Sequence, residues 1–289
     1  MPRIPLQDLN CAFYLYPSRA AAESGLAVGG SGFWVAITSL RVPEFWWLYG
    51  VSNQHVVHRS GASVIRANSK DGGLKIIEAE PTDWIEHPGG HDVAILPIEG
   101  NNQPTDIEVM QVSPGMFVTR EDVRLEVFGV GDEVYMIGRF INHEGRVRNT
   151  PSARFGNISM LPGEPIYIDA KRPAQESFAV ELRSSCGYSA SPVFVHANVA
   201  RNYRPSAFGP DALLGVHWGN IVEPWNVETK IIKKAIQSGL AADERKVDQV
   251  SANTGMNGVV PAWRLMELLE MPKFKAVREA DEEVQLVRL

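Results

Sequence analysis

The chain is 289 residues long and 44% hydrophobic, with 25 glycines and 19 prolines. This length and composition exclude a disordered chain and are enough for a full core in one or two compact domains. The 28 Lys and Arg against 34 Asp and Glu give a net charge of −6, and neither sign forms a long block, so we expect no nucleic-acid partner. No window approaches the ~20 consecutive apolar residues of a membrane span, and the first residues lack the pattern of a secretory signal. We therefore expect no membrane partner and a cytoplasmic location.

Short β-prone runs alternate with turn residues along most of the chain. They lie at 33–38, 47–52, 62–67, 75–79, 93–98, 123–128, 133–137, 166–169, 178–182, 192–195 and 213–217. This spacing is typical of an all-β sandwich or barrel, with helix confined to late positions. Pro261 followed by apolar residues at helical spacing predicts a helix near the C-terminus. An amphipathic pattern predicts a second helix within 226–240, and the charge-rich stretch 273–289 is interpreted as a loose tail.

The two cysteines, Cys11 and Cys186, are too few for a disulfide framework or a four-sulfur metal site, and they fit a reducing compartment. We expect free thiols that pack as small apolar side chains. His87, His91 and Asp92 form a candidate group of metal ligands, but no third segment supplies a clear partner, so a surface turn is preferred. We expect no metal and no cofactor.

Three segments carry candidate reactive side chains, in the chain order His, Asp, Ser. His55 ends a β-prone run, Asp92 leads an apolar strand, and Ser189 lies in a tight turn of small residues before another strand. Alone, the histidine is more often a packed residue and the aspartate an ordinary strand cap. Gly187 lets the backbone turn so that its N–H and that of Ser189 face one spot, which suits an oxyanion. A serine nucleophile needs a base and an orienting acceptor, and the chain offers one candidate of each.

Several motifs occur together in a consistent order. They are Gly30-Ser31-Gly32-Phe33, Ser52-Asn53-Gln54-His55-Val56-Val57, His91-Asp92-Val93-Ala94-Ile95-Leu96, the loop 187–193, Leu214-Gly215-Val216-His217-Trp218-Gly219 and Gly258-Val259-Val260-Pro261. In this set the sequence resembles chymotrypsin-fold serine peptidases of the bacterial trypsin-like group, nearest to the glutamyl endopeptidases. The resemblance spans residues ~25 to ~270.

The resemblance implies an all-β fold of two six-stranded antiparallel barrels, with a helical insertion and a C-terminal helix. Residues 1–120 would form the barrel with His55 and Asp92, and residues 121–260 the barrel with Ser189, interrupted by the insertion 221–257. Residues 261–289 would form the C-terminal helix and tail. The implied activity is a serine endopeptidase that cuts a protein or peptide substrate through an acyl-enzyme. The Gly187 and Ser189 N–H groups would bind the oxyanion.

Two residues depart from the family pattern. Tyr188 stands where trypsin has an aspartate that pairs with a newly cut N-terminus, so activation by that ion pair is unsupported. Ala190 replaces the usual glycine after the nucleophile. The alternative therefore stays open that the chain is a catalytically inactive binding or regulatory module on a protease fold.

Substrate preference is predicted by analogy with the glutamyl endopeptidases, which cut after Glu or Asp. His217 stands at their substrate-binding histidine, and Ser184 and Arg183 are further pocket candidates. Equally, His217 could bond within the core or to Asp92, and Arg183 could face solvent. The insertion 221–257 is a candidate gate or docking segment for a regulatory partner.

We expect two further clusters to have a structural role. Arg139, Arg146, Arg148 and Arg154 are expected on a solvated loop. The run Phe45-Trp46-Trp47 is expected to pack in the core, with an exposed contact as the alternative.

Overall fold

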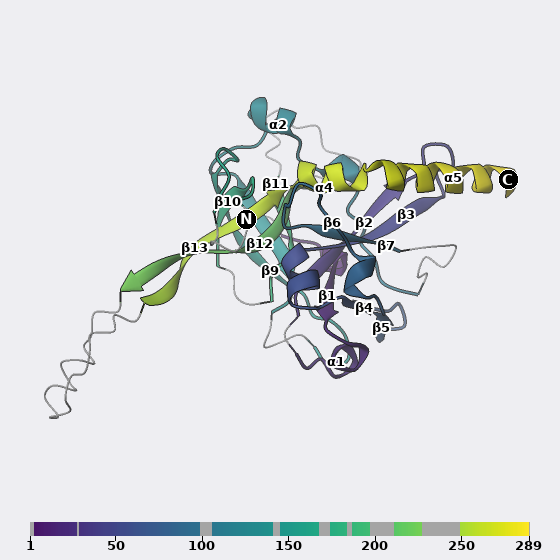
Figure 1. Ribbon diagram of the computed structural model, residues 1–289, viewed down its shortest axis with the longest axis horizontal. Coiled ribbons are helices and arrows are strands. Elements are labelled where there is room, and N and C mark those ends of the chain that lie inside the picture. The colour runs from purple at the N-terminus through teal and green to yellow at the C-terminus, as the bar shows by residue number, and fades with distance from the viewer. Residues whose placement is uncertain are drawn as a thin grey trace, which may run out of the picture.

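The structure is a computed structural model, and it describes residues 3–27, 29–98, 106–140, 145–167, 174–183, 187–196, 211–226 and 249–288. The chain forms two antiparallel β-structures that follow one another in sequence, with few helices (Figure 1). The predicted all-β, double-barrel fold class is confirmed, with the difference that the first β-structure is a curled sheet of seven strands and not a closed barrel of six. No helix in the described ranges is long and apolar enough to cross a membrane.

The first β-structure is a curled sheet of seven strands, in the order β5-β4-β1-β2-β3-β7-β6. Its strands are β1 (Ala12–Tyr16), β2 (Ser31–Thr38), β3 (Trp46–Ser52), β4 (Val64–Asn68), β5 (Leu74–Ile77), β6 (Ile85–Glu86) and β7 (Ala94–Ile98). Central strands β1 to β3 are almost wholly buried, because their apolar residues pack on both faces. The sheet thus holds β2 and β3 rigidly side by side.

The second β-structure is a closed six-stranded barrel in the order β10-β13-β12-β11-β8-β9. Its strands are β8 (Glu133–Gly138), β9 (Ser152–Met160), β10 (Phe178–Leu182), β11 (Pro192–His196), β12 (Asp211–Asn226) and β13 (Gln249–Pro261). β12 and β13 pair from Gly215↔Pro261 to Asn226↔Gln249, and their far ends project from the barrel as a two-stranded ribbon (Figure 1). That ribbon is the described part of the predicted insertion; the predicted helix within 226–240 lies outside the described residues, Asn226 apart.

Helices lie at the edges of the sheets. They are α1 (Arg19–Ser24), α2 (Arg120–Arg124), α4 (Ala262–Leu269) and α5 (Pro272–Arg288), with short 3₁₀ turns at Leu6–Cys11, Pro81–Asp83 and Pro114–Met116. α1 begins at Ser18, whose side chain accepts from Ala21 N, and ends at Gly25 with a φ of 68°. α4 follows Pro261 as the sequence predicts, and α5 runs on from it across the first sheet (Figure 1).

Some expected elements are wrong. The run 123–128 does not form a strand, because Thr119 and Asp122 make a capping box that starts α2 instead. With α1 and α2, helix is not confined to late positions. The stretch 273–289 is not a loose tail, since α5 extends through it to Arg288. Strands β1, β6 and β9 lie outside the predicted runs.

The expectation of a solvated arginine loop is also wrong in part. The Arg139 side chain is 1% exposed, and its guanidinium lies over the rings of Tyr14 and Tyr16, 5.6 and 4.8 Å from their centroids. Arg154 belongs to β9 and donates from Nε to the Tyr188 hydroxyl at 3.1 Å. Both cations are therefore part of the packing between strands.

The aromatic run sits partly buried at the start of β3. Trp47 packs edge-on against Phe45, with ring centroids 5.0 Å apart. Its indole Nε1 donates to Asp281 Oδ2 of α5 at 2.9 Å. The run therefore anchors the C-terminal helix to the first sheet.

Candidate active site

His55 follows directly on strand β3. The strand ends at Ser52, and the backbone turns at Asn53 into a π-helical turn, His55–Arg59. The buried Asn53 amide donates to the Asp92 carbonyl at 2.7 Å. The end of β3 is therefore tied to Asp92, two residues before β7, and this bond places His55 beside Asp92.

The Asp92 carboxylate contacts His55 through both oxygens. The His55 backbone N–H donates to Oδ1 at 2.9 Å, and ring atom Nδ1 lies 2.6 Å from Oδ2. Asp92 is 8% exposed, so this contact is largely shielded from water. A carboxylate at Nδ1 selects the tautomer with the proton on that nitrogen, which leaves Nε2 with its lone pair. The pair thus has the arrangement of a base and its orienting acceptor.

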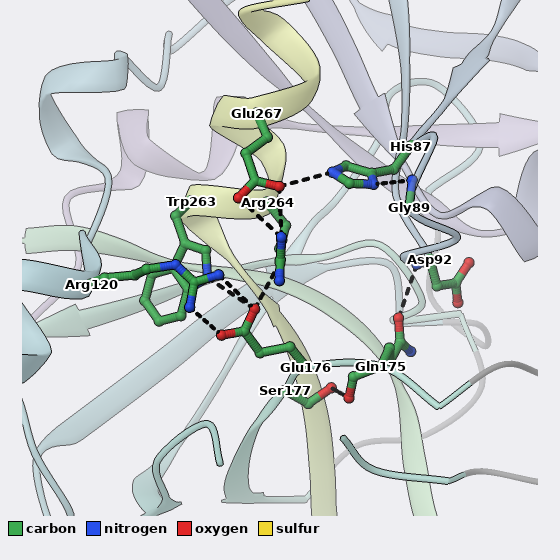
Figure 2. Close-up of polar contacts among 10 residues, drawn as sticks. All are labelled: His87, Gly89, Asp92, Arg120, Gln175, Glu176, Ser177, Trp263, Arg264 and Glu267. Atoms are coloured by element: carbon green, nitrogen blue, oxygen red, sulfur yellow. Dashed lines mark hydrogen bonds and ion pairs between the residues drawn. The ribbon is translucent and has the colours of Figure 1, made fainter. Parts of the chain in front are cut away.

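Asp92 is also held from the second β-structure. Its backbone N–H donates to Gln175 Oε1 at 2.9 Å (Figure 2). Gln175 is buried and lies just before β10, where it pairs with Ile166. The acid of the first sheet is therefore fixed by a side chain that belongs to the barrel.

Next to Gln175, the Glu176 carboxylate accepts hydrogen bonds from charged and polar donors. They come from Arg120, Trp263 and Arg264 (Figure 2). Burial alone would raise the pKa of Glu176, but these donors hold it below its ordinary value. Because Trp263 and Arg264 belong to α4, helix α4 stabilises the segment that supports Asp92.

Ser189 lies in a turn that leads into β11. Its carbonyl accepts from Ser31 N at 2.8 Å, and the turn is closed by Ser191 N, which donates to the Tyr188 carbonyl at 3.0 Å. Gly187 has a φ of 98°, so the predicted need for glycine there is met. Ser189 itself is partly exposed, as a reacting hydroxyl has to be.

The two departing residues are built into this turn. Tyr188 is fully buried, and its hydroxyl contacts Ser152 Oγ and accepts from Arg154 Nε of β9. Ala190 adopts a φ of 67°, the left-handed region that favours glycine. Its N–H donates to the His217 carbonyl at 2.8 Å, which ties the turn to β12.

His217 is bonded inside the barrel. The ring is 2% exposed, with Nδ1 2.9 Å from the Tyr188 carbonyl and Nε2 3.1 Å from Asn257 Oδ1. Asn257 uses its Nδ2 to donate to the carbonyls of Leu182 and Gly255, so its oxygen faces the histidine. Burial lowers the pKa of His217, against the opposing effect of both acceptors. The sequence left open whether His217 binds substrate or bonds inside the protein, and the structure has hydrogen bonds within the core.

Of the other two pocket candidates, the structure describes Arg183, and no described contact joins it to His217. Arg183 is exposed. Ser184 lies outside the described residues, as does Cys186. Cys11 is a buried free thiol, as expected.

His87 and His91 lie together in the turn before Asp92, with ring centroids 4.9 Å apart. His87 Nδ1 accepts from Gly89 N, and its Nε2 lies 3.3 Å from Glu267 Oε2 of α4 (Figure 2). Within the part of the chain that the structure describes, no group of three or more His, Cys, Asp or Glu residues could hold a metal ion.

Three residues that support this geometry were missed from the sequence: Asn53, Gln175 and Ser31. Asn53 and Ser31 do lie inside the motifs quoted above, so their position was a usable signal. Gln175 lies in a loop with no pattern of its own, and only its contact with Asp92 shows its role.

Models of known protein families and curated protein sequences give no match to the chain. Among solved structures, the MamO protease domain from Magnetospirillum magneticum has a TM-score of 0.51 at 14% identity, over 92% of this chain and 98% of that one. The Rv3671c protease from M. tuberculosis in its active form has a TM-score of 0.44 at 16% identity, covering 89% and 77%. The HtrA-type protease AlgW has a TM-score of 0.43 at 15% identity, covering 83% and 50%. The likeness to the MamO domain shows that this chain has the double-barrel fold of a protease domain.

Proposed function

We propose that the chain is a serine endopeptidase in which Ser189, His55 and Asp92 act together. The supporting observation is the double contact between Asp92 and His55, through the backbone N–H and through Nδ1. Two contacts to one carboxylate fix both the orientation and the tautomer of the ring. His55 Nε2 is then the atom that takes a proton from the Ser189 hydroxyl.

The proposed reaction has two halves. Ser189 Oγ attacks the substrate carbonyl while His55 takes the proton of the Ser189 hydroxyl. Asp92 stabilises the imidazolium that forms. The N–H groups of Gly187 and Ser189 bind the oxyanion, and the imidazolium returns its proton to the leaving amine. Water then attacks the acyl-enzyme with His55 as base, which releases the second product.

The second candidate function is a binding or regulatory module that retains the fold without catalysis. The observation that favours it is Ala190, whose left-handed backbone and methyl group follow the proposed nucleophile directly. The intact pairing of His55 with Asp92 favours the enzyme, because an inactive scaffold has no need of a base held in one tautomer.

A preference for Glu or Asp before the scissile bond is a finer proposal, and it sets a condition on His217. Both ring nitrogens contact protein oxygens, so the ring binds a substrate carboxylate only if Nε2 exchanges Asn257 Oδ1 for it. We expect Asn257→Ala to change the ratio of kcat/KM for a peptide with Glu to one with Gln at this position. A ratio of about 1 in the wild-type protein would contradict the acidic preference and leave the peptidase proposal intact.

Labelling with a fluorophosphonate, followed by mass spectrometry of the modified peptide, tests the proposed function. The wild-type protein should be labelled on Ser189, and Ser189→Ala should not be labelled. Asp92→Asn should slow labelling by several orders of magnitude, since it presents the wrong imidazole tautomer. Ser191→Ala is the matched control, because it removes a buried serine hydroxyl two residues away and should label normally. A folded wild-type protein that does not react would favour the inactive module.

A further inference from the structure

Ser31 of β2 lies at a junction of four hydrogen bonds, and its side chain is fully buried. Its N–H donates to the Ser189 carbonyl at 2.8 Å, and its hydroxyl donates to the Gly187 carbonyl at 2.8 Å. Its hydroxyl also accepts from Arg139 N at 2.9 Å, and its carbonyl accepts from Ser52 Oγ at 3.1 Å. One residue therefore joins three separate segments of the chain.

Two of the bonds restrain the turn of the proposed nucleophile. They fix the carbonyls of Gly187 and Ser189, the same residues whose N–H groups are proposed to bind the oxyanion. A carbonyl fixed by a donor cannot rotate freely, so each bond limits the torsion angles of its residue. Because the Gly187 backbone is in a region with little intrinsic preference, it depends more than other residues on such a bond.

The other end of the junction lies on the histidine side. Ser52 is the last residue of β3, three residues before His55, and β2 pairs with β3 along Phe33↔Val51 to Thr38↔Trp46. The bond from Ser52 Oγ to Ser31 extends this pairing to the end of the strand. Ser31 thus lies between the element that presents the base and the turn that presents the nucleophile.

The surroundings of the hydroxyl leave it in one position. It serves as donor to Gly187 and as acceptor from Arg139 N, so both roles are used at once. A Cβ atom on Gly138 would come within 3.1 Å of this oxygen. The site is therefore closely packed around a small hydroxyl side chain.

We propose that Ser31 is a positioning residue, which holds the Gly187–Ser189 turn against the strand of His55 and so keeps the oxyanion site formed before substrate binds. This inference rests on the proposed function and adds a residue to it. It makes the Ser31 hydroxyl responsible for transition-state stabilisation without contact to the substrate.

The kinetic test compares Ser31→Ala and Ser31→Thr with Ser63→Ala as matched control. Ser63, directly before β4, is also buried, and its hydroxyl donates to the Ala79 carbonyl at 2.6 Å, away from the turn. We expect Ser31→Ala to lower kcat by about 10- to 100-fold with little change in KM, because the substitution weakens stabilisation of the transition state and not binding of the substrate. Ser31→Thr retains a hydroxyl and should recover part of kcat, because its added methyl group enters a closely packed site, and Ser63→Ala should leave kcat unchanged.

Amide hydrogen exchange gives a readout that does not depend on activity. The Ala190 N–H is bonded to the His217 carbonyl of β12, and the Ser191 N–H to the Tyr188 carbonyl within the turn. Both should exchange faster in Ser31→Ala and at the wild-type rate in Ser63→Ala. If Ser31→Ala does not fold, Ser31→Cys replaces it, since a thiol fills the site as a weaker donor, with smaller effects of the same sign.

The outcomes separate the two proposals. An inactive wild-type protein contradicts the proposed function, and faster exchange in Ser31→Ala would then support the restraint on the turn alone. Unchanged exchange in a folded Ser31→Ala overturns the inference. Faster exchange with an unchanged kcat, or an equal loss of kcat in Ser63→Ala, also overturns it, because Ser31 would then be only structural.

Discussion

Ala190 combines two features that oppose one another. Its backbone has a φ of 67°, which costs a residue with a Cβ atom about 1–2 kcal/mol relative to glycine. Its methyl group is fully buried in the core cluster that also contains Phe194 and Trp218, and burying a methyl group contributes about 0.8 kcal/mol. Strain and burial therefore nearly cancel, and this explains how an alanine is tolerated after the proposed nucleophile.

This balance predicts the effect of Ala190→Gly. The substitution relieves the strain and loses the methyl contact, so the free energy of unfolding should change by less than about 1 kcal/mol. Ala179→Gly is the matched control, because Ala179 is buried in β10 without positive φ and should lose more stability. Urea denaturation measures both. An equal or larger loss for Ala190→Gly would contradict the strain at this position.

The sequence predicts the candidate functional residues more readily than the residues that hold them. His55, Asp92 and Ser189 end or begin β-prone runs, so their pattern was visible. Gln175 bonds Asp92 from 83 positions away, and no local pattern encodes such a contact. The contacts of His217 with Tyr188 and Asn257 were likewise beyond reach, because they depend on how β12, β13 and the turn pack together.

At the scale of elements, helix α5 is fastened to the first sheet through a buried cation. Arg278 is 8% exposed, and its Nη1 donates to the Tyr49 hydroxyl at 3.1 Å and to the Leu269 carbonyl at 3.0 Å. Its Nη2 lies 3.0 Å from Glu270. These bonds join β3, the end of α4 and α5 at one point.

Arg278→Ala should therefore lower the free energy of unfolding by about 2–3 kcal/mol, since charged hydrogen bonds in a buried place are lost together. Arg41→Ala is the control on the same interface. Its contact with Glu283 joins two largely exposed side chains, so the urea midpoint should hardly move. A loss in Arg278→Ala no larger than in the control would mean that α5 is held by other contacts.

Elements with a buried apolar pattern were predicted from sequence, and elements with weak patterns were not. The buried strands β2, β3, β7 and β11 matched their predicted runs to within two residues. β9 was missed because most of its residues are only partly buried, so apolar and polar positions do not alternate clearly. The sequence does not predict α5, because its charged residues bond to partners in or beside the first sheet, which lie more than 200 positions away.

At the scale of the whole molecule, buried histidines make the stability depend on pH. Burial, together with the positive charges of Arg264 and of His87, lowers the pKa of His91 to about 4, against the opposing effect of Glu176 and Glu267. In the unfolded chain a histidine titrates near 6.5. Between these values the unfolded state binds the extra proton, so stability falls as the pH drops from about 6.5 to about 4. Burial also lowers the pKa of His87 and His217, which adds to the same loss.

We therefore expect the urea midpoint to fall between pH 7 and pH 4.5, and to fall less in His91→Gln, which removes one of these protonation sites. Unfolding curves at both pH values measure the difference. The same fall in the variant and the wild-type protein would show that the pKa of His91 is close to its unfolded value.

Two sheets with different closure meet at the proposed site: the open first sheet supplies His55 and Asp92, and the closed barrel supplies Ser189 and Gln175. The fold class follows from strand spacing and motif order. Whether each sheet closes into a barrel does not follow from them, because closure depends on which edge strands pair with one another.

The predicted domain boundaries remain predictions, as do the cytoplasmic location and the regulatory role of the insertion.

The central claim is that Ser189 is the nucleophile of a peptidase, and hydrolysis of a defined peptide mixture tests it most directly. Cleavage products of the wild-type protein and of Ser189→Ala are measured by mass spectrometry, after both are shown to unfold at the same urea concentration. The account predicts cleavage of internal peptide bonds by the wild-type protein and none by Ser189→Ala. Cleavage by Ser189→Ala at the wild-type rate, or intact peptides after incubation with the folded wild-type protein, would contradict it.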